Sequence, residues 1–264
     1  MQKIYHLFFE KLIEKPKFSH FYLSIFEKIY LKIFKSSYNI SQELNHNINI
    51  LDKYNLDINQ CKNTLSENNL DFESDRLSWH YHFFSSIKDE NIKILEIGTH
   101  KGEFTRFLSN NLPNSTIHTI DVESSDHKFL EAYQDDKKNQ IEFIKKRNEN
   151  LNSQNINFKE LNSFYLLDHF KNEEFDYIWL DGDHLNPQVT IDIFSCLKII
   201  KKNGLILCDD VIKSDYFDTQ INIDTYNVLL YLKKMGLIHY DLLNKRITKY
   251  NAIIKKHIAI IKKQ

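Results

Sequence analysis

A short polar segment, Asp181-Gly182-Asp183-His184, directly follows the apolar run FDYIWL and combines groups suited to acid–base chemistry. A histidine can take up a proton near neutral pH, so His184 is a candidate general base. A structural, hydrogen-bonded histidine in a simple turn is the alternative, since Asp-Gly is a common turn dipeptide. The chain has only five glycines, and we expect Gly182 to allow a sharp turn that directs Asp181 and His184 into one cavity.

Two further aspartates, Asp209 and Asp210, close the next apolar run, GLILC. If both runs are neighbouring parallel strands, these carboxylates lie beside Asp181 at the same sheet edge. Two like charges about 4 Å apart repel by about 4 kcal/mol at an effective dielectric constant near 20, so such a trio requires a cation or protonation. Oxygen ligands favour magnesium, manganese or calcium over zinc. The sequence predicts a metal site of Asp181, Asp209 and Asp210, unless Asp210 only caps the following segment.

The elements that would position these groups follow from residue 92 onwards, where short β-branched runs alternate with helical stretches. Strands are predicted at residues 92–98, 116–121, 155–161, 175–181 and 204–210. This alternation is typical of a Rossmann-like, doubly wound α/β fold with a mostly parallel sheet. Two later runs, residues 238–247 and 257–263, predict an antiparallel pair at one sheet edge.

A glycine turn, E-I-G-T-H-K-G, follows the first predicted strand and runs from Glu96 to Gly102. Gly98 and Gly102 would let the backbone turn tightly and approach a ligand closely. Thr99 and His100 occupy the place where a dinucleotide-binding turn needs its second glycine, which favours a ligand without a diphosphate.

The next two strand ends supply Asp121, Asn162 and Ser163. A carboxylate about twenty residues beyond such a glycine turn commonly accepts hydrogen bonds from ribose hydroxyls, although Asp121 could instead cap a helix. Asn162 and Ser163 suit an adenine edge, and a helix cap explains Ser163 equally well.

This ordered set of strand ends resembles the class I S-adenosylmethionine-dependent methyltransferases, over residues 92–212. It is most similar to the metal-dependent sugar O-methyltransferases, the macrocin and mycinamicin group. The resemblance implies that His184 is the general base and that Asp181, Asp209 and Asp210 hold Mg²⁺, with Mn²⁺ as a possible substitute. It implies that the donor, S-adenosylmethionine, is bound by Glu96, Gly98, Thr99, Gly102, Asp121, Asn162, Ser163 and Asp181. Catechol-type relatives carry lysine at the spacing of His184.

The resemblance implies a metal-dependent methyl transfer from S-adenosylmethionine to a hydroxyl of a sugar or nucleotide-linked sugar, for surface polysaccharide or a glycosylated metabolite. A bound cation would acidify that hydroxyl and align it with the methyl carbon. Two alternatives stay open. The acceptor could be phenolic or phosphorylated, or the chain could be a non-catalytic binding module.

The resemblance does not extend to residues 1–75, which contain no glycine and predict a helical region, separate from a catalytic domain at residues 76–264. Residues 18–34 carry apolar and aromatic side chains on more than one helical face. We interpret this segment as a helix that packs on the protein body or forms a homo-oligomer, with a membrane-surface helix as the alternative.

Composition and charge exclude some of the remaining classes of protein. The net charge of -1 excludes a strongly basic nucleic-acid binder, and 42% apolar with 27% charged residues is ordinary for a globular protein. The three cysteines, Cys61, Cys196 and Cys208, have no metal-binding spacing and suggest no disulfide framework. Charges interrupt the first apolar run too early for a signal peptide, so a cytoplasmic location is expected.

Overall fold

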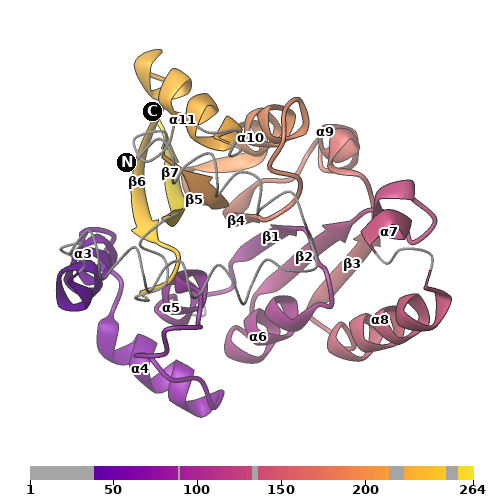
Figure 1. Cartoon of the computed structure of the whole chain (residues 1–264), viewed down its shortest axis with the longest axis horizontal. Helices are drawn as coiled ribbons and strands as arrows, with labels where there is room; N and C mark the ends of the chain where they lie inside the picture. Colours follow the sequence, from indigo (N-terminus) through magenta and orange to yellow (C-terminus); the bar gives the residue numbers. More distant parts are fainter. Residues whose placement is uncertain (1–38, 89, 133–135, 214–222, 248–254) are drawn as a thin grey trace, which may run out of the picture.

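One mixed sheet lies at the centre of the computed structural model, which describes residues 39–88, 90–132, 136–213, 223–247 and 255–264 (Figure 1). Its strands are β1 (Lys93–Ile97), β2 (Thr116–Asp121), β3 (Ile156–Glu160), β4 (Phe175–Leu180), β5 (Ile200–Ile212), β6 (Ile238–Asn244) and β7 (Lys256–Lys263). Their order is β3-β2-β1-β4-β5-β7-β6. The strands β1 to β5 pair in parallel, whereas β7 is antiparallel to both β5 and β6. The predicted Rossmann-like sheet with an antiparallel edge is confirmed.

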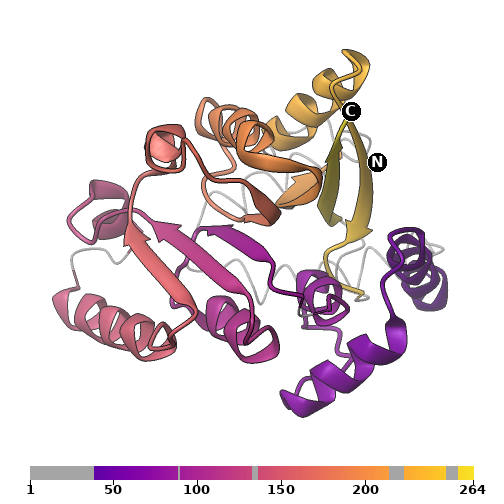
Figure 2. The same cartoon turned by 180° about the vertical axis from the view of Figure 1, so that it is seen from behind.

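Helices cover both faces of this sheet, as expected for parallel strands joined by crossovers (Figures 1 and 2). On one face lie α9 (Leu166–His169), α10 (Gln188–Ile199) and α11 (Asp224–Lys234). On the other lie α5 (Trp79–Ser85), α6 (Glu103–Asn111) and α8 (Lys137–Asn150). The short helices α7 (His127–Ala132) and η1 (Ser163–Tyr165) follow β2 and β3.

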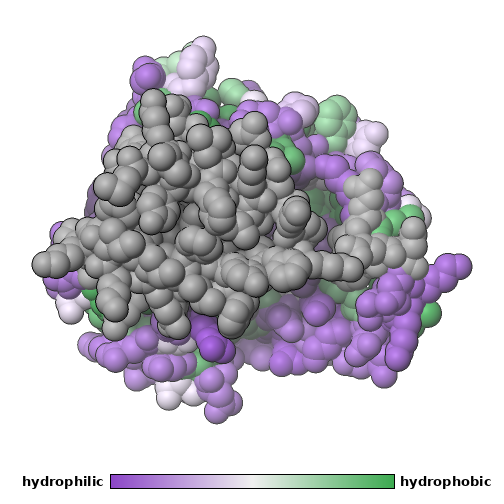
Figure 3. Space-filling view, in the orientation of Figure 1, coloured by the Kyte–Doolittle hydropathy of each residue, from purple (hydrophilic) through white to green (hydrophobic). Residues whose placement is uncertain are grey.

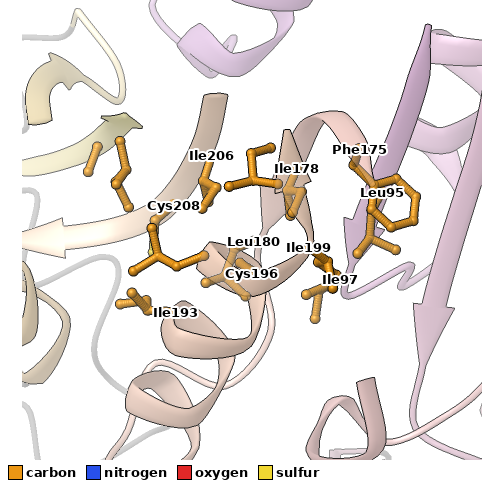
Figure 4. Close-up of a cluster of buried hydrophobic side chains, with 14 of the residues drawn as sticks. Leu95, Ile97, Phe175, Ile178, Leu180, Ile193, Cys196, Ile199, Ile206 and Cys208 are labelled. Carbon is orange, nitrogen blue, oxygen red and sulfur yellow. The ribbon is translucent and has the colours of Figure 1, made fainter. Parts of the chain in front are cut away.

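Alternation along the central strand β4 explains why its sequence is an almost continuous apolar run. Ile178 and Leu180 are buried against α10 on one face, in the cluster drawn in Figure 4. Tyr177 and Trp179 pack into the core on the other face. Because successive side chains of a strand point to opposite faces, a strand buried on both sides must be apolar throughout.

The helices α3 (Ile40–Lys53) and α4 (Ile58–Glu67) form the described part of the predicted N-terminal helical region. Ile50, Leu51 and Leu65 belong to the same apolar core as Trp179 of the sheet. The helical prediction is confirmed for these residues, and the boundary at residue 75 stays a prediction. Residues 18–34, for which a packing or membrane-surface helix is predicted, lie outside the described residues.

Helix α3 is fixed to the sheet by a reciprocal pair of hydrogen bonds. Asn47 Nδ2 donates to the Asn244 carbonyl oxygen at 2.9 Å, and the Asn244 N–H donates to Asn47 Oδ1 at 2.8 Å. Both side chains are buried. The contact therefore connects the N-terminal region to the end of β6, one residue before Lys245.

The described surface in Figure 3 is mostly hydrophilic, with scattered apolar residues. Within the described ranges, no helix has the length and apolar character needed to cross a membrane.

Candidate active site

A cavity of about 440 Å³ lies at the carboxyl ends of β1 to β4, where an open parallel sheet places its ligands. This volume is within the range of small-molecule sites, roughly 300–1,000 Å³. We call it the donor cavity. Five of the residues predicted to bind the donor line it, namely Gly98, Asp121, Asn162, Ser163 and Asp181.

Asp121 is held in the donor cavity by backbone groups next to it in space. Its Oδ2 accepts the His100 N–H at 2.7 Å, and its Oδ1 accepts the Val122 N–H at 2.8 Å. Burial raises the pKa of Asp121, although these hydrogen bonds oppose the rise. A carboxylate has more acceptor positions than these bonds use, so Asp121 can still accept hydrogen bonds from ligand hydroxyls.

Asn162 and Ser163 serve as cavity wall and local structure at the same time. Asn162 Oδ1 accepts the Phe164 N–H at 3.0 Å and so begins η1. Ser163 Oγ accepts from Gln188 Nε2 at 2.9 Å. The helix cap that the sequence suggested for Ser163 is instead formed by Asn162, and both residues line the cavity.

Gly98 is required by the close approach of two strand ends. Its φ is +100°, and an added Cβ would lie 2.2 Å from the carbonyl oxygen of Asp181. The Asp181 N–H in turn donates to the Ile97 carbonyl at 2.9 Å. The glycine therefore lets β1 and β4 come together beneath the donor cavity.

Glu96, Thr99 and Gly102, also predicted to bind the donor, do not line the cavity. Glu96 is buried and accepts hydrogen bonds from the hydroxyls of Thr105 and, at 2.5 Å, Thr119. Thr119 also contacts Thr99 Oγ1 at 2.6 Å. Burial raises the pKa of Glu96 to about 8, with the hydroxyl bonds opposing the rise. Glu96 and Thr99 therefore stabilise the glycine turn through buried hydrogen bonds and do not face the cavity.

Gly102 begins α6 with a φ of +69°, a left-handed conformation that glycine adopts readily. Gly182, by contrast, does not have a left-handed backbone conformation. The atom nearest to a Cβ added there would be a methyl carbon of Ile97, at 3.4 Å. The expectation that a glycine is needed at 182 for a sharp turn is therefore wrong. The strand-end glycine that the geometry demands is Gly98.

Sequence reasoning missed the helical part of the cavity wall. Lys128 and Phe129 of α7, Phe143 of α8 and Gln188 of α10 all line the cavity. No local motif marks these residues, because they reach the strand ends only through the packing of their helices. Asp183 also lines the cavity and pairs with Lys128.

His184 lies at the edge of this cavity, next to one of its lining residues. Its Nε2 is 3.5 Å from Asp181 Oδ1. Burial alone would lower the pKa of His184, but Asp181, Asp210 and Asp209 together raise it. The imidazole is thus within the electrostatic reach of all three aspartates predicted as metal ligands.

A β-bulge shapes the end of β5 where Asp209 and Asp210 lie. The pairing of β5 with β7 shifts register between Cys208 and Val211, and Asp210 has a φ of +50°. In a regular strand these neighbouring side chains would point to opposite faces. A bulge re-aims side chains, and here both carboxylates reach one lysine.

That lysine is Lys245, which follows β6. Its Nζ contacts Asp209 Oδ2 and lies 2.6 Å from Asp210 Oδ1, while Lys256 Nζ lies 2.5 Å from Asp210 Oδ2. Burial and the charge of Asp181 raise the pKa of Asp209 to about 7. Burial also acts on Asp210, but the two lysines outweigh it and lower its pKa to about 2.

These contacts decide whether the predicted Mg²⁺ or Mn²⁺ fits. A hard cation needs carboxylate oxygens that face it, yet Lys245 and Lys256 already neutralise Asp209 and Asp210. Among the residues that the structure describes, no group of three or more His, Cys, Asp or Glu side chains is arranged to hold a metal ion. The observed arrangement of Asp181, Asp209 and Asp210 therefore does not fit a divalent cation.

Comparisons with known proteins bear on the region that carries these sites. Residues 95–211 match the model of a family described as a methyltransferase domain. A search of curated proteins gives no significant match.

Solved structures share the fold at low sequence identity. A Staphylococcus aureus protein provisionally named a caffeoyl-CoA O-methyltransferase has 16% identity and a TM-score of 0.52, and the match covers 82% of this chain and 97% of that one. A Klebsiella pneumoniae protein provisionally named an O-methyltransferase has 16% identity and a TM-score of 0.49, with 91% and 96% covered. The first likeness shows a common fold.

Proposed function

We propose that this chain, whose residues 95–211 match the model of a methyltransferase domain, is a class I methyltransferase that transfers a methyl group from S-adenosylmethionine to a hydroxyl of a sugar. The observation that carries the proposal is the position of Asp181. This residue lines the donor cavity and also lies 3.5 Å from His184. It therefore connects the site where a donor would bind to a group that can accept a proton.

The donor cavity supports S-adenosylmethionine through both its apolar and its polar walls. Ile97, Ile120 and Phe143 offer apolar surface for an adenine ring, and Asp121 has acceptor positions for ribose hydroxyls. The glycine turn at Gly98 lacks the second glycine that a pyrophosphate requires. Each feature suits a nucleoside without a diphosphate.

Proton transfer is assigned to His184. As the acceptor oxygen forms its bond to the methyl carbon, the carbon–sulfur bond breaks and its electron pair stays on sulfur, giving S-adenosylhomocysteine. The hydroxyl proton passes to the imidazole. General-base catalysis of this kind raises the rate by about 10²–10⁴-fold. Because lysines pair with Asp209 and Asp210, no step of this reaction runs through a divalent cation.

The choice of a sugar acceptor rests on the resemblance of the segment Asp181–His184 to the sugar O-methyltransferases. A phenolic or phosphorylated acceptor is the alternative within the same reaction class. The predicted homo-oligomer interface in residues 1–75 is a separate proposal, to be read from the oligomeric state of the full chain.

The test combines donor binding with turnover. Calorimetry with S-adenosylhomocysteine should show binding, and a panel of sugars, nucleotide sugars, phenols and phosphorylated compounds should reveal which class yields S-adenosylhomocysteine from the donor. His184→Gln should lose about 10²–10⁴-fold in kcat and bind the product as the wild type does. His127→Gln, an exposed histidine on α7, is the matched control and should keep full turnover.

Turnover by His184→Gln at the wild-type rate would refute the base assignment. If donor binding is retained while no acceptor class reacts, the non-catalytic binding module becomes the better account.

A further inference from the structure

The ammonium group of Lys245 lies where the sequence predicts a divalent ion, bridging Asp209 and Asp210 at the end of β5. We propose that Lys245 is the built-in cation of the acceptor site and donates a hydrogen bond to the acceptor oxygen during methyl transfer. This inference rests on the proposed function and deepens it, because it names a further catalytic residue of the same site.

The backbone of Lys245 is held on both sides. Its N–H donates to the Lys256 carbonyl at 3.0 Å, and its own carbonyl accepts the Trp79 N–H at 2.9 Å. The preceding residue, Asn244, is fixed by Asn47. Only 11% of the Lys245 side chain is exposed. The ammonium therefore belongs to a built site and differs from a mobile surface lysine.

The β-bulge in β5 also indicates that the Lys245 ammonium belongs to a built site. It interrupts the regular pairing between Cys208 and Val211, and Asp210 adopts a left-handed φ of +50°. A non-glycine residue rarely takes this conformation, which persists where surrounding contacts compensate for it. The contact that both re-aimed carboxylates share is Lys245.

Hydrogen-bonding capacity remains on both partners. An ammonium carries a further N–H donor beyond the two that Asp209 and Asp210 accept. Asp209 Oδ1 is buried and has no hydrogen-bond partner among the described residues. A buried acceptor of this kind usually has a partner, which an acceptor hydroxyl can supply. The pair thus offers one donor and one acceptor to neighbouring hydroxyls of a diol.

The chemistry balances without a metal. The acceptor oxygen uses a lone pair to bond to the methyl carbon, the electron pair of the broken carbon–sulfur bond goes to sulfur, and the hydroxyl proton goes to His184. Lys245 keeps its own protons throughout. Its charge stabilises the negative charge that develops on the oxygen, as fixed donors do in other active sites.

Direct measurement of Mn²⁺ binding tests whether Lys245 takes the place of a divalent cation, and this experiment needs no acceptor. The full chain with S-adenosylhomocysteine is titrated with Mn²⁺ and followed by electron paramagnetic resonance. The wild type should leave Mn²⁺ free, whereas Lys245→Met should bind it, since Asp209 and Asp210 then lack their shared cation. Lys256→Met is the matched control and should leave Mn²⁺ free, because Lys245 still bridges both aspartates.

Turnover gives the second readout. Chelators should not change the wild-type rate, and Lys245→Met should lose about 10²-fold or more in kcat at unchanged S-adenosylhomocysteine affinity. Lys245→Arg, which keeps the charge, should recover part of this loss. Thermal melting checks that each variant folds.

Mn²⁺ binding by the wild type, or loss of its activity on chelation, would overturn the inference even if Lys245→Met cannot be folded. A folded Lys245→Met chain that leaves Mn²⁺ free or keeps the wild-type rate would overturn it as well. If no acceptor reacts while the Mn²⁺ pattern is as expected, the proposed function fails and the cation assignment survives.

Discussion

The carboxyl edge of the sheet has two halves, and each stabilises its carboxylates by different contacts. The half that carries the proposed donor site, at β1 to β3, is called the donor half, and there Asp121 accepts backbone N–H groups of His100 and Val122. The half that carries the proposed acceptor site, at β4 and β5, is called the acceptor half, and there Asp209 and Asp210 contact the side-chain ammonium of Lys245 from a distant hairpin.

This difference shows what each half depends on. In the donor half, Asp121 is positioned by turns next to its own strands, and the helices α7, α8 and α10 complete the cavity wall. The acceptor half requires the correct register of β6 and β7 and the docking of α3 and α5. Changes in one half should therefore leave the other measurable.

The largest expected effect comes from Gly98→Ala, at the junction of the two halves. The new Cβ would lie 2.2 Å from the Asp181 carbonyl oxygen, at a φ of +100°. We expect a loss of about 3 kcal/mol or more in the free energy of unfolding, with donor binding lost too. Urea unfolding measures it. Gly182→Ala, which meets only ordinary contacts, should stay within about 1 kcal/mol; an equal cost for both would contradict the account.

Asn47→Ala should weaken the acceptor half through helix α3. It leaves the buried Asn244 N–H without its partner, so we expect a loss of about 2–3 kcal/mol in unfolding free energy and a lower kcat, as Lys245 follows Asn244. S-adenosylhomocysteine affinity should be unchanged in the folded protein. Lys53→Met removes an exposed ion pair of the same helix and should cost less than about 1 kcal/mol.

Asp121→Ala should affect the donor half alone. We expect a 10–100-fold loss of S-adenosylhomocysteine affinity by calorimetry, about 1.5–3 kcal/mol, because hydrogen bonds to a charged group are lost. Asp57→Ala removes another backbone-capping carboxylate, at the start of α4, and should leave affinity unchanged. An unaltered affinity in Asp121→Ala would remove the ribose assignment.

The smallest effect concerns pH. The pKa of Glu96 is raised from 4.5 to about 8, so its stabilising contribution is complete below about pH 4.5 and is lost as the pH rises through about 8. Between pH 6.5 and 7.5 the unfolding free energy of the wild type should fall by about 1 kcal/mol more than that of Glu96→Gln. Urea titrations at both pH values test this. Parallel slopes for the two proteins would show that Glu96 is ionised in the fold.

Prediction from sequence succeeded where the determining interactions are local. Alternating apolar runs gave the five parallel strands, and the glycine turn with Asp121 gave much of the donor cavity. The reason for Gly98 was still different from the expected one, since the atom nearest to an added Cβ is the backbone oxygen of Asp181, directly after β4, and not a ligand.

Prediction failed where the position depends on long-range register. Asp209 and Asp210 were predicted to close a strand that instead continues to Ile212, and the bulge that turns both toward one side has no local signal. Lys245 follows β6, and it reaches these carboxylates only because β7 pairs with both β5 and β6 and so fixes the end of β6 near Asp209 and Asp210. A charge argument correctly demanded a cation for these carboxylates and had no means of identifying it as a side chain.

The insertion of β7 between β5 and β6 also sets an order of events during synthesis. Both outer neighbours leave the ribosome before the strand that joins them, so Lys245 cannot reach its final position while β7 is still in the exit tunnel. Until β7 pairs with both strands, the carboxylates of Asp209 and Asp210 lack the ammonium that they share in the completed fold.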